Sequence, residues 1–203
     1  MASEHKGLPV ISFATPAAWR QWLVKHHDKA PGLWLKFAKK DSGVASVAKP
    51  EAIAVAIAFG WIDGQINPFD DTAWLTRFTP RGPTSRWSQI NQRTAERLIA
   101  AKQMAKTGLA EVEKAKADGR WAKAYAPQAT ATVPDDLQAA LDAEPKARAF
   151  SATLDSANRY AVLYRVHDAK TAATRQARID KFIAMLTKGE TLHPPRKTKA
   201  KKA

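Results

Sequence analysis

The large aromatic side chains of this chain gather in its N-terminal part, and this asymmetry constrains the possible fold more than any other feature. All seven tryptophans lie at or before Trp121, and five of the seven phenylalanines lie at or before Phe78. Residues 122–132 (AKAYAPQATAT) are low in bulk, and the rest of the chain carries helical patterns. Because aromatic rings contribute much of a protein core, the sequence predicts an aromatic-rich N-terminal part, a linker and a helical C-terminal part.

The N-terminal part opens with a helix pattern that is followed by a strand pattern. Thr15 is suited to cap a helix, and Pro16 is suited to its first position. Trp19 and Trp22 lie on one face of this helix, where we expect them to pack in the core. Residues 33–40 (LWLKFAKK) alternate between apolar and other side chains, which predicts a strand.

A buried helix and a β-hairpin are expected next. Residues 52–59 (AIAVAIAF) are apolar on nearly every side, so we expect this helix to be fully buried, with Gly60 as its end. Residues 61–66 and 73–78 both have strand character, and the sequence NPFDD between them is typical of a turn. We therefore expect the two strands to pair as a hairpin.

Two helices are predicted between the hairpin and the linker. Ser88 is a suitable N-cap for a long helix that runs to about Lys106. Thr107-Gly108 is expected to end this helix, and residues 109–118 are expected to form another, which Gly119 ends.

The C-terminal part is predicted to be helical, with helix starts at Pro134, Pro145, Ser156 and Thr171. The expected fold class is therefore α+β, with a small N-terminal antiparallel sheet flanked by helices and a helical C-terminal unit packed on it. The expected divisions are an α+β domain at 10–121, a linker at 122–132, a helical domain at 133–192 and a disordered basic tail at 193–203.

The charge of the chain favours anionic partners. The formal net charge is +14, and the last eight residues, RKTKAKKA, hold five bases and no acid. Nucleic acid, acidic lipid headgroups and phosphorylated ligands are all compatible with this charge; alternatively, the charge serves only solubility. In the nucleic-acid hypothesis, the tail binds without sequence specificity. Its binding residues are then Arg196, Lys197, Lys199, Lys201 and Lys202.

Several function classes receive no support from the sequence. The absence of cysteine excludes disulfides and thiolate metal sites. The five histidines lack ligand spacing, and the common nucleotide-binding and hydrolase motifs are absent. We therefore predict no catalytic residue, metal or cofactor. No apolar run is long enough to span a membrane, and the N-terminus lacks the apolar run of a signal peptide, so a cytoplasmic location is expected.

The densest group of chemically active residues lies between Phe59 and Asn91. Arg81 and Arg86 precede the helix that begins at Ser88, and a helix N-terminus offers unpaired N–H groups and partial positive charge. Guanidinium groups bind phosphate or carboxylate well, and a neighbouring tryptophan can stack on a ring or a sugar. We therefore predict an anion site in this region. Its candidate ligand-binding residues are Trp61, Asp63, Arg81, Ser85, Trp87, Ser88, Asn91 and Trp121.

A purely structural interpretation of the same residues is also open. In it, Ser88 only caps the helix, Asn91 supports the cap, and Arg81 pairs with Asp63 in the core. Asp63 is flanked by apolar residues, so we expect it to be partly buried and in need of a partner. A further alternative is an enzyme in which Asp63 acts as acid or base and Arg81 holds an anion.

Three motifs, GWIDGQ, TPRGPTSRWSQIN and GLAEVEKAKADGRW, resemble the YdeI or OmpD-associated family, also called bacteriocin-protection proteins. The similarity extends into RYAVLYRVHDAKTAATRQARIDKFIAMLTKGE and spans roughly residues 15–192. The positions that carry it are Trp61, Asp63, Gly64, Arg81, Ser85, Trp87, Ser88, Asn91, Gly119, Trp121, Lys170, Thr174, Arg175 and Arg178.

The resemblance implies a role in tolerance of bacteriocins, cationic antimicrobial peptides and stress, and it implies no particular reaction or cofactor. Combined with the residues above, it suggests a cytoplasmic resistance protein that binds a small anionic ligand or partner near Arg81–Asn91. The alternatives are a nucleic-acid-associated protein and an uncharacterised enzyme that uses Asp63 and Arg81.

Overall fold

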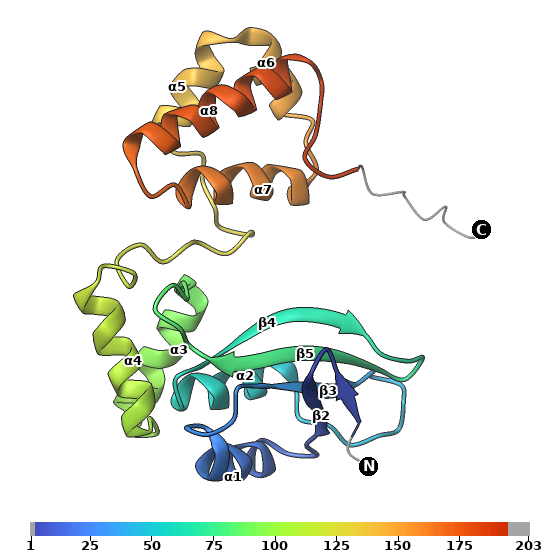
Figure 1. Cartoon of the computed structure of the whole chain (residues 1–203). Helices are drawn as coiled ribbons and strands as arrows, with labels where there is room; N and C mark the ends of the chain where they lie inside the picture. Colours follow the sequence, from blue (N-terminus) through green and yellow to red (C-terminus); the bar gives the residue numbers. More distant parts are fainter. Residues whose placement is uncertain (1–2, 195–203) are drawn as a thin grey trace. The chain divides into compact units, whose positions relative to one another are not determined.

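The computed structural model describes residues 3–194 of the chain (Figure 1). The chain divides into two compact units, Met1–Ala124 and Tyr125–Ala203. The N-terminal unit holds β1 (Glu4–His5), β2 (Leu8–Ser12), α1 (Pro16–His26), β3 (Leu33–Ala38), α2 (Lys49–Ala58), β4 (Trp61–Pro68), β5 (Ala73–Pro80), α3 (Gln89–Ala100) and α4 (Lys106–Ala117). The C-terminal unit holds α5 (Asp135–Ala143), α6 (Pro145–Ser151), α7 (Ser156–His167) and α8 (Ala172–Thr187). The predicted α+β class is confirmed.

The sheet of the N-terminal unit has the strand order β1-β2-β3-β5-β4. Strands β4 and β5 form the predicted antiparallel hairpin, and β3 pairs antiparallel with β5. The prediction lacked β1 and β2, and β2 pairs with β3 in parallel, so the sheet is mixed and not purely antiparallel. Helices α1 and α2 lie against one face of the sheet (Figure 1).

Tryptophan side chains form the centre of the N-terminal core, as predicted for Trp19. Trp19 and Trp61 are almost completely buried, and their ring centroids are 6.1 Å apart. The Trp19 indole donates to the Ala52 carbonyl at 3.1 Å, and the Trp61 indole donates to the His27 carbonyl at 3.1 Å. These bonds matter because a buried indole N–H without a partner is costly. The two rings thereby connect the sheet to α1 and α2.

Helix α2 is less buried than predicted. Ala56 and Ile57 are fully buried, but Ile53 and Val55 are only partly buried. The apolar composition alone predicted burial on every side. In the structure, α2 lies beside α1 and α3 and keeps one side partly open, so the expectation of complete burial is wrong.

The boundary between α3 and α4 also differs from the prediction. Helix α3 ends at Ala100, and α4 begins at Lys106, so Gly108 lies inside a helix and does not end one. A Cβ atom at Gly108 would lie 2.3 Å from the Ala58 carbonyl oxygen. Glycine is therefore required there because α4 packs against the end of α2, and Gly119, with φ +79°, is the actual end signal.

The C-terminal unit has its own apolar core, built from all four of its predicted helices. Leu137 of α5, Ala147 of α6, Val166 of α7 and Phe182 of α8 are all buried in it. This core contains no tryptophan, as the distribution of aromatic residues in the sequence predicts.

Candidate functional site

Arg81 follows strand β5 directly and is held in place from three directions. Its backbone N–H donates to the Gly60 carbonyl at 2.9 Å, and its Nη1 donates to the Arg86 carbonyl at 3.1 Å. Its guanidinium carbon lies 3.6 Å from the centroid of the Trp87 ring, which is a close cation–π contact. The residue is only 7% exposed. Arg81 is therefore a preorganised cation with little freedom to move.

The loop between β5 and α3 is closed by two serines. The Ser85 hydroxyl accepts from the Gly82 N–H at 3.0 Å, and the Ser88 hydroxyl accepts from the Asn91 N–H at 3.1 Å. Ser88 is thus the predicted N-cap of α3, and it is buried. The Ser88 hydroxyl already accepts from the Asn91 N–H group. The first turn of α3 therefore has fewer free N–H donors for an anion than the sequence suggested.

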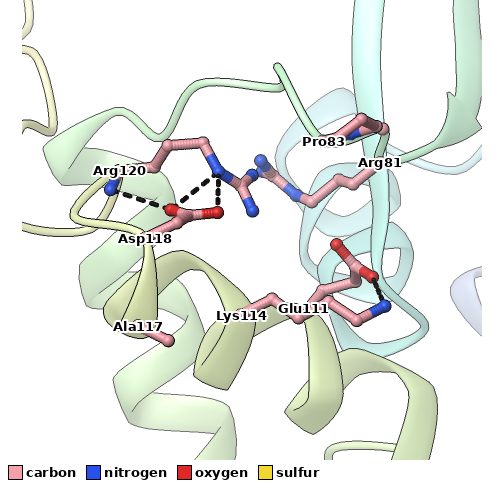
Figure 2. A pocket seen from close by; sticks show the side chains of 8 residues that line it. Arg81, Pro83, Glu111, Lys114, Ala117, Asp118 and Arg120 are labelled. Atoms are coloured by element: carbon pink, nitrogen blue, oxygen red, sulfur yellow. Dashed lines mark hydrogen bonds and ion pairs between the residues drawn. The ribbon is translucent and has the colours of Figure 1, made fainter.

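A cavity of about 340 Å³ opens between this loop and helix α4 (Figure 2). Its lining combines three cationic and two acidic side chains with small residues. The lining residues are Arg81, Gly82, Pro83, Glu111, Lys114, Ala117, Asp118 and Arg120. In Figure 2, Arg81 and Arg120 point toward one another across this space.

Arg120 is positioned by contacts on both sides. Its Nε donates to the Asp118 carboxylate at 2.8 Å, and its Nη1 donates to the Ser85 carbonyl at 2.9 Å. The backbone N–H of Arg120, together with its guanidinium, holds the pKa of Asp118 below its ordinary value, so this acid stays ionised. Asp118 therefore offsets part of the charge of Arg120.

The two guanidinium groups are bound to consecutive carbonyl groups, those of Ser85 and Arg86. Consecutive Cα atoms are about 3.8 Å apart, so this loop brings the charges of Arg81 and Arg120 close together. Like charges at short range repel each other, and an anion that contacts both relieves the repulsion. The arrangement is chemically suited to a carboxylate or a phosphate.

A second cavity of about 200 Å³ adjoins the first. It shares Arg81, Glu111 and Lys114 with the larger cavity, and Trp61 is part of its wall. Lys114 and Glu111 form an ion pair at 2.8 Å (Figure 2), in which the lysine side chain is 66% exposed. Glu111 is only 16% exposed, so it keeps Lys114 in place. Because an ammonium group has three donors, Lys114 can contact a bound anion while it stays paired with Glu111.

The structure brings some of the predicted site residues together. Arg81 lines both cavities, Trp61 lines the smaller one, and Ser85 supplies the carbonyl that holds Arg120. The Trp87 ring packs against the Arg81 guanidinium on one face. It also contacts the Trp121 ring, with 4.9 Å between the ring centroids. These contacts give the two tryptophans a supporting position.

The other predicted residues lie outside both cavities. Ser88 and Asn91 belong to the helix cap, and Asp63 is partly exposed on β4. Within residues 3–194, the Asp63 carboxylate has no hydrogen bond or ion pair, so the expected pairing with Arg81 is wrong. Since neither cavity includes Asp63, the acid–base arrangement of the enzyme hypothesis is not found in them.

The prediction missed four charged residues of the cavity wall. Glu111, Lys114, Asp118 and Arg120 come from α4 and the turn that follows it. All four lie within the motif GLAEVEKAKADGRW, and the Asp-Gly-Arg turn at its end was the available signal. Their approach to Arg81 depends on tertiary packing, which no local pattern reveals.

The marked positions of the C-terminal unit have structural roles. Arg175 donates to the Asp136 carboxylate at 2.8 Å and to the Val166 carbonyl at 3.0 Å. Arg178 donates to the Arg165 carbonyl. Both carbonyls belong to the last turn of α7, where cationic side chains stabilise a helix end. Lys170 is exposed just before α8, and Thr174 takes part in the cap of α8 through Thr171.

The predicted nucleic-acid-binding residues Arg196, Lys197, Lys199, Lys201 and Lys202 lie outside the described residues. Within the described part of the chain, no helix is long and apolar enough to cross a membrane. Across the same residues, no group of three or more histidine or acidic side chains is arranged to hold a metal ion.

Comparison with protein families divides the chain at the same place as its fold. Residues 130–189 match the family described as Bacteriocin-protection, YdeI or OmpD-Associated. Residues 11–111 match a separate family, Domain of unknown function (DUF8412). No curated protein and no solved structure matches the chain.

The match to the bacteriocin-protection family lies within the C-terminal unit, and the suspected resemblance is confirmed there. This match covers residues 130–189 and not the whole range 15–192. The motifs GWIDGQ and TPRGPTSRWSQIN lie within the match to the domain of unknown function.

Proposed function

We propose that the protein protects a bacterial cell against bacteriocins or cationic antimicrobial peptides, and that it acts from the cytoplasm. The observation that supports this role is the family match of residues 130–189. We further propose that the N-terminal unit senses or binds a small anion, or an anionic group of a partner, in the cavity of Arg81, Lys114 and Arg120.

The resistance role is tested by expressing the full chain in a bacterial strain that is sensitive to a bacteriocin. We expect the minimal inhibitory concentrations of the bacteriocin and of a cationic antimicrobial peptide to rise several-fold. Fractionation of the same cells should recover the protein in the cytoplasm. Unchanged inhibitory concentrations at verified expression would contradict the proposed role.

The anion site rests on charged side chains that converge from two separate segments. Arg81 comes from the end of β5, and Lys114 and Arg120 come from α4 and its following turn. Two acids in the same wall, Glu111 and Asp118, leave the lining with a net charge of +1. We therefore propose a small ligand with one compact anionic group, such as a phosphate ester, because a large polyanion would meet these acids.

Inorganic phosphate and pyrophosphate are suitable probes, with binding measured by isothermal titration calorimetry on the full chain. Lys114→Gln should weaken binding by about tenfold, since one charge-assisted contact is lost. Lys116→Gln is the matched control, because Lys116, two residues further along α4, forms the same type of i,i+3 ion pair with Glu113 and does not line the cavity. Equal affinities of the two variants would contradict the proposed site.

Nucleic-acid binding is a second candidate function, and the net charge of +14 favours it. Counterion release makes such binding fall steeply as salt rises. If the basic tail carries it, removal of residues 194–203 weakens the affinity for duplex DNA in low salt. Affinity that does not change with salt would exclude this function.

A further inference from the structure

A third cavity, also of about 340 Å³, lies between helices α1, α2 and α3. It shares no lining residue with the two cavities of Arg81. One arginine from α1, Arg20, and one from α3, Arg97, contribute to its wall. Its position brings together three helices that are far apart in the sequence.

The two arginines differ in how they are held. Arg20 donates through Nη2 to the Gln103 carbonyl at 3.2 Å, and its guanidinium carbon lies 5.2 Å from the centroid of the Phe59 ring. Arg97 is exposed in the last turn of α3 and forms no side-chain hydrogen bond or ion pair within residues 3–194. One cation is therefore oriented in advance, and the other can move toward a ligand.

The acid of the same wall, Glu51, is already engaged elsewhere. Its carboxylate accepts from the Ala48 N–H at 3.1 Å, at the N-terminus of α2, where a negative charge is favourable. Neither Arg20 nor Arg97 pairs with it in the described part of the chain. The charged lining therefore carries a net charge of +1.

Apolar side chains form the rest of the surface. Ala54 and Val55 are two of the partly buried residues of α2 that the sequence pattern predicted to be fully buried, and Leu98 of α3 lies beside them. A volume of 340 Å³ equals that of about eleven water molecules at roughly 30 Å³ each. This is at the lower end of the range for ligand pockets.

We propose that this cavity binds a small amphipathic carboxylate, with its carboxylate group on Arg97 and Arg20 and its apolar body on Ala54, Val55 and Leu98. A guanidinium group matches the two oxygens of a carboxylate, and the apolar wall contributes in proportion to the area that the ligand covers. The incomplete burial of α2 is then a property of the site, because a fully packed α2 would leave no cavity.

The test uses octanoate as the probe, below its micellar concentration, with the full chain labelled for NMR. We expect saturable shifts of α2 and α3 amides, an affinity about tenfold weaker in Arg97→Gln, and little binding of heptylammonium, whose alkyl chain has the same length. Arg93→Gln, an exposed arginine one turn earlier on α3 that does not line the cavity, should leave the affinity unchanged.

Two outcomes would overturn the proposal. One is equal octanoate affinity in Arg97→Gln and Arg93→Gln, and the other is the absence of saturable shifts in α2 and α3. Val55→Asp gives an independent check, since a carboxylate in the apolar wall should abolish octanoate binding while amide spectra show that the fold is kept.

Discussion

Arginine side chains donate to backbone carbonyls in both units of this protein, but the surroundings of these arginines differ between the units. In the C-terminal unit, Arg175 and Arg178 donate to carbonyls at the end of α7. In the N-terminal unit, Arg81 and Arg120 donate to consecutive carbonyls of the loop after β5. All four guanidinium groups therefore donate to backbone carbonyl oxygens.

The difference lies in what surrounds these groups. Arg175 also holds Asp136 through two hydrogen bonds, and Arg178 lies 3.8 Å from Asp168, so these cations are paired within their own unit. Arg120 is likewise paired, with Asp118, but Arg120 and Arg81 also line a cavity of about 340 Å³. An arginine at a position that carries the family resemblance is therefore not by itself evidence of ligand binding. The surroundings of its guanidinium group have to be known first.

The largest effect is expected from Arg81→Ala. The substitution removes a buried cation–π contact and a hydrogen bond and leaves a space above Trp87. We expect the free energy of unfolding of the N-terminal unit to fall by about 2–4 kcal/mol, measured by urea denaturation with tryptophan fluorescence.

Arg77→Ala is the control for Arg81→Ala, because Arg77 is an exposed arginine on β5. It should change the stability by less than about 0.5 kcal/mol. If both variants are equally stable, Arg81 is not anchored as described, and the contrast between the two units weakens.

A smaller effect is expected from Arg175→Ala. The Arg175–Asp136 pair is 30% and 43% exposed, so solvent screens it, but the hydrogen bond to the Val166 carbonyl is lost as well. We expect a loss of about 1–2 kcal/mol, seen as faster hydrogen exchange of the amides of α7. Arg159→Ala, at an exposed position of the same helix, should leave this exchange unchanged.

The smallest effect is a shift in pH dependence. The hydrogen bonds from Arg175 hold the pKa of Asp136 below its ordinary value. The ionised acid therefore stabilises the fold above that ordinary value, and this stability is lost as the pH falls through the lowered pKa. In Arg175→Met, an NMR titration of the Asp136 carboxyl carbon should show its pKa moved back up. An unchanged titration would mean that the pair does not form.

Local signals in the sequence predicted much of the fold. The Thr15 cap with Pro16 located α1, the alternation of residues 33–38 located β3, and the NPFDD turn located the hairpin. These signals act over a few residues and need no knowledge of tertiary structure. Strands β1 and β2 were missed because they are short and their pairing depends on β3 and on each other.

The candidate site was predicted only in part, for a related reason. Arg81 and Trp61 were found because charge and aromatic rings are dense around them in the sequence. Lys114 and Arg120 were missed because they reach the cavity only when α4 packs on α2, at the contact that Gly108 permits. Long-range packing therefore determines which residues form the site. Gly108 is required for this packing, but its sequence context predicted only the end of a helix.

The most direct test follows the arginine side-chain Nε–H signals in NMR while pyrophosphate is added to the full chain. We expect saturable shifts for Arg81 and Arg120 and constant positions for Arg175 and Arg178. Equal shifts of all four signals would indicate non-specific binding to positive charge. Shifts confined to Arg175 and Arg178 would contradict the assignment of roles to the two units.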